Sequence, residues 1–169
     1  SKTERECVVS AVELAEKAGF RELKAGMALK AGDKVYSVNR GKSILLAVIG
    51  KKPLSEGANI GAAHTDAPRL DFKPNPLYED AELAYIKTHH YGGIRKYQWV
   101  TVPLELHGKI VRADGSEVYV KIGADPEDPQ FVINDLLPHL GREQGKKPLN
   151  EAIPSESLNI LIGLSLIHI

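Results

Sequence analysis

The sequence predicts an α/β arrangement for the first part of the chain and a β-rich arrangement for the rest. Residues 3–18 carry apolar side chains at helical spacing, and apolar runs at 43–49 and 58–63 follow with the length of strands. Beyond position 70 the helical periodicity fades, and short strand signals separated by turn residues dominate. We therefore expect a boundary near position 70, which separates residues 1–70 from residues 71–163.

The composition is that of a globular chain. Of 169 residues, 43% are hydrophobic, and 22 basic residues balance 22 acidic residues. A neutral chain lacks the basic surplus that is typical of nucleic-acid binders, and no apolar run approaches the roughly 20 residues that span a bilayer. The single cysteine, Cys7, excludes an internal disulfide and fits a reducing compartment.

The first helix has clear start and stop signals. Thr3 can accept a hydrogen bond from the backbone N–H of Glu6, as in a capping box. Gly19 suits the left-handed position that ends a helix. A short strand at 34–38 then leads into turn-forming residues at 39–42.

Two apolar runs follow the turn. The run at 43–49 is almost unbroken, which indicates a strand buried on both faces. The run at 58–63 consists of small residues and reads as a further strand, which would deliver His64 and Asp66 at its C-terminal end.

The second part of the chain reads mainly as strands. The two prolines within 71–76 exclude a central strand there. Asp114-Gly115 is a strong hairpin turn. Asn134 can cap a short helix through Leu140, and residues 141–157 are polar and read as a mobile loop. Strands are expected at 83–90, 97–106, 109–112 and 117–122.

The His64-Thr65-Asp66 tripeptide is the sharpest chemical feature. A neutral imidazole is a good zinc ligand, and a carboxylate two residues away can orient the ring or raise its basicity. Taken alone the pattern is weak, since a surface pair or a capped turn is the commoner reading of His-x-Asp.

The other histidines carry less information. His89 and His90 are adjacent on an expected strand and so point to opposite faces. His139 lies near the end of the expected short helix, where the helix dipole favours a histidine in any protein. The spacing of Asp, Glu and His completes no metal site along the sequence.

Several segments, in order, resemble aspartyl-type aminopeptidases, which are cytosolic dinuclear-zinc exopeptidases. Residues 64–74 are similar to the H-T-D-[SA]-P-x-L-x-x-K-P motif of that family. Residues 90–94, Trp99, 135–140 and 158–163 also resemble family segments. The resemblance covers nearly the whole chain up to Gly163.

The resemblance implies roles for three residues. His64 corresponds to a zinc ligand, and Asp66 corresponds to the catalytic aspartate that supports it. His139 falls where the family has a histidine that reaches the active site of a neighbouring subunit and binds substrate or the oxyanion. The implied fold is the front of an α/β zinc-peptidase domain (1–70), followed by an incomplete β-rich dimerisation or lid domain (71–163).

The resemblance also implies an activity. Two zinc ions activate a water that hydrolyses the first peptide bond, with a glutamate as general base. The family suggests acidic N-terminal residues as substrates, a cytoplasmic location, and dimers that assemble into a dodecamer. The other ligands and the general base correspond to family segments beyond position 163, so we expect residues 1–169 to be inactive alone.

We expect the chain to be a bacterial family member truncated at both ends. It begins at Ser1 without a methionine, and the family pattern does not continue into residues 164–169. That hexapeptide matches a translated transposon end used in sequencing libraries, so we expect it to be a non-native tail.

Two other readings remain open at this point. The chain could be a non-catalytic β-rich assembly module, or a mononuclear metal-binding protein that uses His64 with His89 or His90. Imidazole and carboxylate also accept cobalt or manganese, so the residues do not single out zinc.

Overall fold

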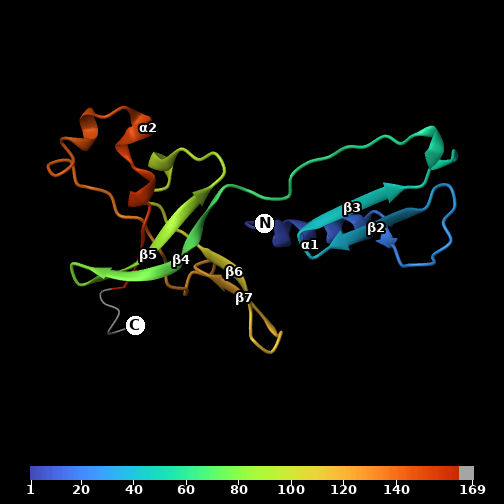
Figure 1. Cartoon of the computed structure of the whole chain (residues 1–169), viewed down its shortest axis with the longest axis horizontal. Helices are drawn as coiled ribbons and strands as arrows, with labels where there is room; N and C mark the ends of the chain where they lie inside the picture. Colours follow the sequence, from blue (N-terminus) through green and yellow to red (C-terminus); the bar gives the residue numbers. More distant parts are fainter. Residues whose placement is uncertain (164–169) are drawn as a thin grey trace. The chain divides into compact units, whose positions relative to one another are not determined.

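A computed structural model describes residues 1–163 of the chain, which divides into two compact units (Figure 1). The N-terminal unit comprises Ser1–Ala67, and the C-terminal unit begins at Pro68. The expected non-native tail at 164–169 lies outside the described residues. No helix within residues 1–163 is long and apolar enough to cross a membrane.

The predicted first helix is confirmed as α1 (Glu4–Lys17). The Thr3 hydroxyl accepts from the Glu6 N–H at 3.2 Å, which satisfies one of the free N–H groups of the first turn. Gly19 has a φ of +84°, a conformation that glycine adopts without strain, and its N–H donates to the Glu16 carbonyl at 2.9 Å. The sequence signals at both ends therefore define the helix.

Three strands complete the N-terminal unit, in the order β1 (Arg21–Glu22), β2 (Lys34–Asn39), β3 (Ser43–Val48). β2 is parallel to β1 and antiparallel to β3, so β2 and β3 form the expected hairpin. The helix α1 packs against β2 and β3. Val8 and Ala15 of α1 and Val35 and Tyr36 of β2 are buried.

Two strand predictions for this unit are wrong. β3 is not buried on both faces, because Leu45 and Leu46 point to opposite sides and are 59% and 47% exposed. β3 is an edge strand, and α1 is the one helix within residues 1–163 that packs on it. Residues 58–63 form no strand, since they pair with no other strand of the described chain; they are extended and exposed.

The main sheet of the C-terminal unit has the antiparallel order β4 (Arg69–Asp80), β5 (Leu83–Tyr91), β8 (Ile160–Gly163). Pro74 and Pro76 lie in β4, at the edge of the sheet, where a missing N–H costs least. The β4–β5 register shifts between Phe72 and Leu77, around the prolines. The exclusion of this segment from a central strand is therefore correct.

The hairpin predicted around Asp114-Gly115 is confirmed as β6 (Leu106–Val111) and β7 (Glu117–Ile122) (Figure 1). The Asp114 Oδ1 accepts from the Ser116 N–H at 2.9 Å, and Gly115 has a φ of +83°. These contacts are the local reason why the chain reverses there.

Three predictions for the C-terminal unit fail. Most of 97–106 is not a strand but the short 3₁₀ helix η2 (Lys96–Gln98) followed by turns. Residues 134–140 contain a tight turn instead of a helix. The polar segment 141–157 is not a structureless loop. It contains η3 (Gln144–Lys146), α2 (Leu149–Ala152) and η4 (Ser155–Ser157).

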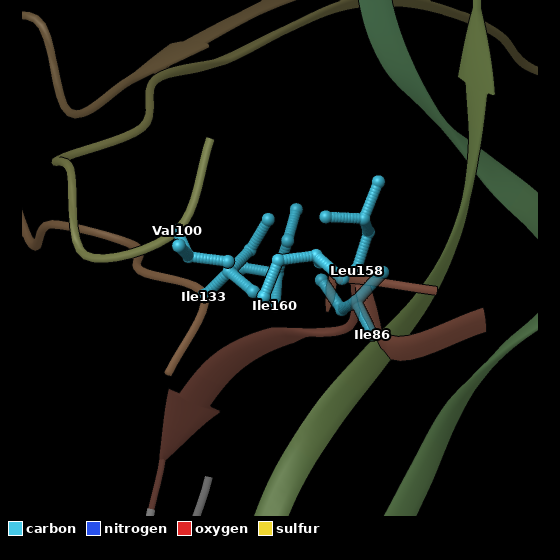
Figure 2. Close-up of a cluster of buried hydrophobic side chains, with 6 residues drawn as sticks. Ile86, Val100, Ile133, Leu158 and Ile160 are labelled. Atoms are coloured by element: carbon cyan, nitrogen blue, oxygen red, sulfur yellow. The ribbon is translucent and has the colours of Figure 1, made fainter. Parts of the chain in front are cut away.

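Tertiary burial explains these differences. Val100 lies in 97–106, Ile153 lies in 141–157 and Ile133 directly precedes 134–140, and all three are buried in one apolar cluster. Figure 2 shows the side chains of this core cluster converging between the sheet and the irregular segments. Its buried members are Ile86, Val100, Ile133, Ile153, Leu158 and Ile160.

We expect Ile133→Ala to destabilise the C-terminal unit by about 2 to 5 kcal/mol, because Ile133 is 1% exposed and its truncation leaves a cavity. Urea unfolding followed by the fluorescence of Trp99, which packs against the core cluster, measures the loss. The matched control is Ile110→Ala, which is 54% exposed and should change stability by less than about 0.5 kcal/mol. Equal losses in the two variants would contradict this placement of the core.

Candidate metal and substrate site

The segment 58–68, which carries His64, is hydrogen-bonded to the rest of the N-terminal unit near the C-terminal end of the segment. Residues 58–68 have no regular secondary structure. The Thr65 hydroxyl donates to the backbone carbonyl of Lys42 at 3.0 Å, next to the start of β3. The side chains on either side of Thr65 are therefore held near the β2–β3 turn, although no strand delivers them.

The imidazole of His64 is oriented by its own loop. Its Nδ1 lies 2.7 Å from the backbone carbonyl oxygen of Asp66. A carbonyl only accepts, so Nδ1 must carry the proton and, in the neutral ring, Nε2 keeps its lone pair. The side chain is 82% exposed. His64 thus presents the form of imidazole that binds a metal through Nε2.

The carboxylate of Asp66 is the more distant partner of the same ring. Its Oδ1 lies 3.4 Å from the His64 Nδ1, and the side chain is 34% exposed. The carbonyl of Asp66, at 2.7 Å, therefore makes the orienting hydrogen bond, and the carboxylate adds charge beside it. Of the two roles that the sequence suggests for the carboxylate, orienting the ring falls to the carbonyl, and raising the basicity of the ring stays a prediction.

The donor type at His64 fits zinc, but the number of donors does not complete a site. A zinc ion in a protein takes at least three protein ligands. Within residues 1–163, no group of three or more His, Cys, Asp or Glu side chains gathers in a way that could hold a metal ion. His64 is therefore a single zinc-compatible ligand in the described part of the chain.

His89 and His90, the alternative metal ligands, lie at the end of β5. Their rings stack with centroids 5.7 Å apart. His90 Nδ1 is buried and has no hydrogen-bond partner within the described chain. His89 is the register partner of Asp71 on β4. His89 also contributes in a minor way to the lowered pKa of Glu156, whose main cause is the hydrogen bond from Lys73.

His139 lies in the tight turn of the C-terminal unit. The N–H groups of Leu140 and Gly141 both donate to the Leu137 carbonyl at 2.9 Å, so the turn closes directly around Pro138 and His139. His139 is exposed. Because the turn is not a helix, the reading of His139 as a helix C-terminal histidine is wrong.

Sequence reasoning missed the contact that closes this turn. The Asp135 Oδ1 accepts from the Leu136 N–H at 2.8 Å and from the Gln144 side-chain amide at 2.9 Å. A cavity of about 260 Å³ opens beside the turn, lined in part by Asp135, Pro138 and Gln144. No local sequence pattern predicts a hydrogen bond between two side chains that lie nine residues apart across a turn.

Comparison with known proteins identifies the family. The sequence model of the aminopeptidase I zinc metalloproteases, known as M18, matches residues 1–166. The chain belongs to the M18 family. The match runs through both units and so gives no support to the reading as a non-catalytic assembly module.

M18 relatives are found among curated sequences. The chain is 54% identical over 166 residues to "Probable M18 family aminopeptidase 1" of Clostridium acetobutylicum, and the alignment covers 96% of the chain and 36% of the relative. It is 46% identical over 163 residues to the protein of the same name from Borreliella burgdorferi, with the same coverage. The chain thus spans about 36% of the length of these curated relatives.

Solved M18 structures have the same fold over this length. The M18 aminopeptidase of Thermotoga maritima matches with a TM-score of 0.86 at 44% identity, over 96% of the chain and 36% of that structure. Aminopeptidase I of Clostridium acetobutylicum matches with a TM-score of 0.83 at 48% identity, over 97% of the chain and 36% of that structure. The mixed α and β content expected from the sequence is therefore that of M18 enzymes.

Proposed function

We propose that the protein to which this chain belongs is a zinc-dependent aminopeptidase that removes single residues from the N-terminus of peptides. One observation carries the proposal: His64, within a chain that matches M18 over residues 1–166, is exposed and holds its Nδ1 proton against a backbone carbonyl. That arrangement leaves Nε2 available to a metal.

His64 would hold one zinc ion through Nε2, and Asp66 would support it. The Asp66 carbonyl fixes the tautomer and direction of the ring, and the carboxylate 3.4 Å from Nδ1 raises the basicity of the neutral imidazole. When bound, zinc supplies a Lewis acid that activates water and stabilises developing negative charge. We propose two zinc ions per active site, whose other ligands and general base are contributed from outside residues 1–163.

We propose that His139 serves the active site of a neighbouring subunit. The turn that carries it is exposed, and the leucines around it, Leu136, Leu137 and Leu140, are 56%, 60% and 64% exposed. An apolar tip with an imidazole at its end fits insertion into a second protein surface. There the imidazole N–H would donate to substrate or to the oxyanion.

The two parts of the chain then have different tasks. We propose that residues 1–70 are the front of the α/β catalytic domain and that residues 71–163 belong to an inserted dimerisation or lid domain. The exposed faces of β3 support the first assignment, because an M18 protein has further chain to cover them. The subunits would form dimers that assemble into a dodecamer.

The substrate preference and location extend the same proposal. We propose peptides with N-terminal aspartate or glutamate as substrates and the cytoplasm as the location, where a lone half-buried Cys7 stays reduced. Hydrolysis assays with matched peptides that begin with Asp, Glu, Ala or Leu test the preference directly.

We expect purified 1–169 to release no N-terminal residue, even with added zinc, because one histidine cannot hold two metal ions. The complete protein, assayed under identical conditions, should show zinc-dependent aminopeptidase activity. Measurable release by 1–169 would contradict the assignment of the remaining ligands to other parts of the protein. An inactive complete protein with bound zinc would contradict the proposed function itself.

A further inference from the structure

We propose that Asp135 and Gln144 are positioning residues that clamp the turn carrying His139 in the geometry that the reaction needs. The inference rests on the function proposed above, since it assumes that His139 acts in the active site. It assigns to two residues a role that their sequence positions do not suggest.

The clamp joins the two ends of the turn. A single oxygen, the Asp135 Oδ1, accepts from the Leu136 N–H at 2.8 Å and from the Gln144 Nε2 at 2.9 Å. Asp135 precedes the turn and Gln144 follows it, nine residues later. Both bonds have a carboxylate acceptor, which makes them stronger than hydrogen bonds between neutral groups.

Backbone bonds continue the clamp through the turn. Leu137 accepts from Leu140 and Gly141, and the Gly141 carbonyl accepts from the Gly145 N–H, each at 2.9 Å. The side-chain amide of Gln144 also lies against Gly141: a Cβ on that glycine would meet the Gln144 Oε1 at 3.3 Å. Gln144 is therefore hydrogen-bonded to Asp135, and its side chain lies close to Gly141.

Packing does little to hold the turn. Leu136, Leu137 and Leu140 are more than half exposed. The 260 Å³ cavity is lined by turn residues and also by Val100 and Ile153 of the core cluster, so open space lies between part of the turn and the core. Because apolar contacts are few here, the polar clamp decides where the imidazole of His139 is presented.

The proposed role of the clamp is to restrict the motion of the turn, so that the His139 imidazole keeps one position. An imidazole that donates to a developing oxyanion must be held close to its final position, because a misplacement of about 1 Å can cost as much as a hundredfold in rate. Loss of the clamp should therefore reduce turnover while leaving the metal in place.

The first test is hydrogen exchange on purified 1–169. Gln144→Leu should accelerate exchange of the Leu140 and Gly141 amides by about tenfold. Without the bond from Gln144 to Asp135, the turn that holds these two amides against the Leu137 carbonyl opens more often. The amide of Leu161 in β8, which donates to the Val132 carbonyl, is the internal reference and should not change. Gln130→Leu, at an exposed glutamine of the same unit, is the control variant and should leave all these amides unchanged.

A pair of substitutions at Asp135 keeps the test valid if Gln144→Leu unfolds the unit. Asp135→Asn retains an oxygen that can accept both bonds, although more weakly, so its exchange rates should stay much closer to those of the unchanged chain than those of Asp135→Ala. Asp135→Ala removes the acceptor and should accelerate exchange of Leu140 and Gly141 by about tenfold. Unchanged exchange in Asp135→Ala, or equal acceleration in both variants, would overturn the clamp.

The second test is kinetic and uses the complete enzyme. Gln144→Leu and Asp135→Ala should each lower kcat by about tenfold with KM within about twofold and zinc content unchanged, whereas Asp135→Asn should retain most of kcat. Accelerated exchange with unchanged kcat would overturn the positioning role. His139→Ala in the same assay tests the proposed function separately, so failure of the clamp and failure of the function give different results.

Discussion

Replacing His64 by alanine in the complete enzyme should abolish aminopeptidase activity by removing zinc. The imidazole is exposed, its Nδ1 is committed to the Asp66 carbonyl, and Nε2 is the atom left to bind metal. Loss of one of a few zinc ligands removes the ion that activates water. We expect kcat/KM to fall by about three orders of magnitude or more. Zinc content per subunit, measured by atomic emission, should fall with it.

The structure supplies two controls for this result. Asp66→Asn keeps the carbonyl 2.7 Å from the ring, so it should cost about ten- to hundredfold, less than His64→Ala. A double His89→Ala, His90→Ala variant should keep its zinc. If that double variant loses metal instead, the mononuclear reading with His64 is right. If His64→Ala retains both zinc and activity, His64 is no ligand.

Elements with local signals could be predicted from the sequence. Thr3 and Gly19 define the ends of α1, and Asp114-Gly115 defines the β6–β7 hairpin, because each acts through hydrogen bonds or backbone conformations within a few residues. The prolines of β4 correctly excluded a central strand for the same reason. None of these features depends on residues that are distant in the sequence.

Elements that depend on distant partners could not be predicted. The apolar run that became β3 predicts two covering layers, yet within residues 1–163 only α1 packs on it. The small residues at 58–63 suit a strand but have no neighbour to pair with in this length of chain. Conversely, Ile153 lies in a polar segment that looked unstructured, and burial in the core cluster orders it.

The candidate site also contains some contacts that are local in sequence and others that join distant residues. The spacing of His64 and Asp66 drew attention to the pair, since the contact between them is local, but their proposed roles come from the family resemblance. The donor of that contact is a ring nitrogen and its acceptor a backbone carbonyl, which residue types alone do not reveal. Gln144 was missed because it acts across a turn on Asp135, and only coordinates bring the two together.

Replacing His139 by alanine should reduce turnover without loss of metal or of fold. The side chain is exposed on a turn, so its removal leaves the core cluster intact. If it donates to the oxyanion, kcat should fall by about a hundredfold to a thousandfold. Arg142→Ala, in the same segment and also exposed, is the matched control for a change at the surface of the turn, and it should retain most of the activity. Unchanged kinetics in His139→Ala would refute the role.

Complementation between variants tests whether His139 acts in a neighbouring subunit. Subunits with His64→Ala and subunits with His139→Ala should each be inactive alone. In an assembly of both, some active sites combine an intact His64 from one subunit with an intact His139 from its neighbour. Random mixing in equal amounts makes about a quarter of the sites competent, so about a quarter of the activity should return. If both residues acted within one subunit, no site in the mixture would contain both, and mixing would restore nothing.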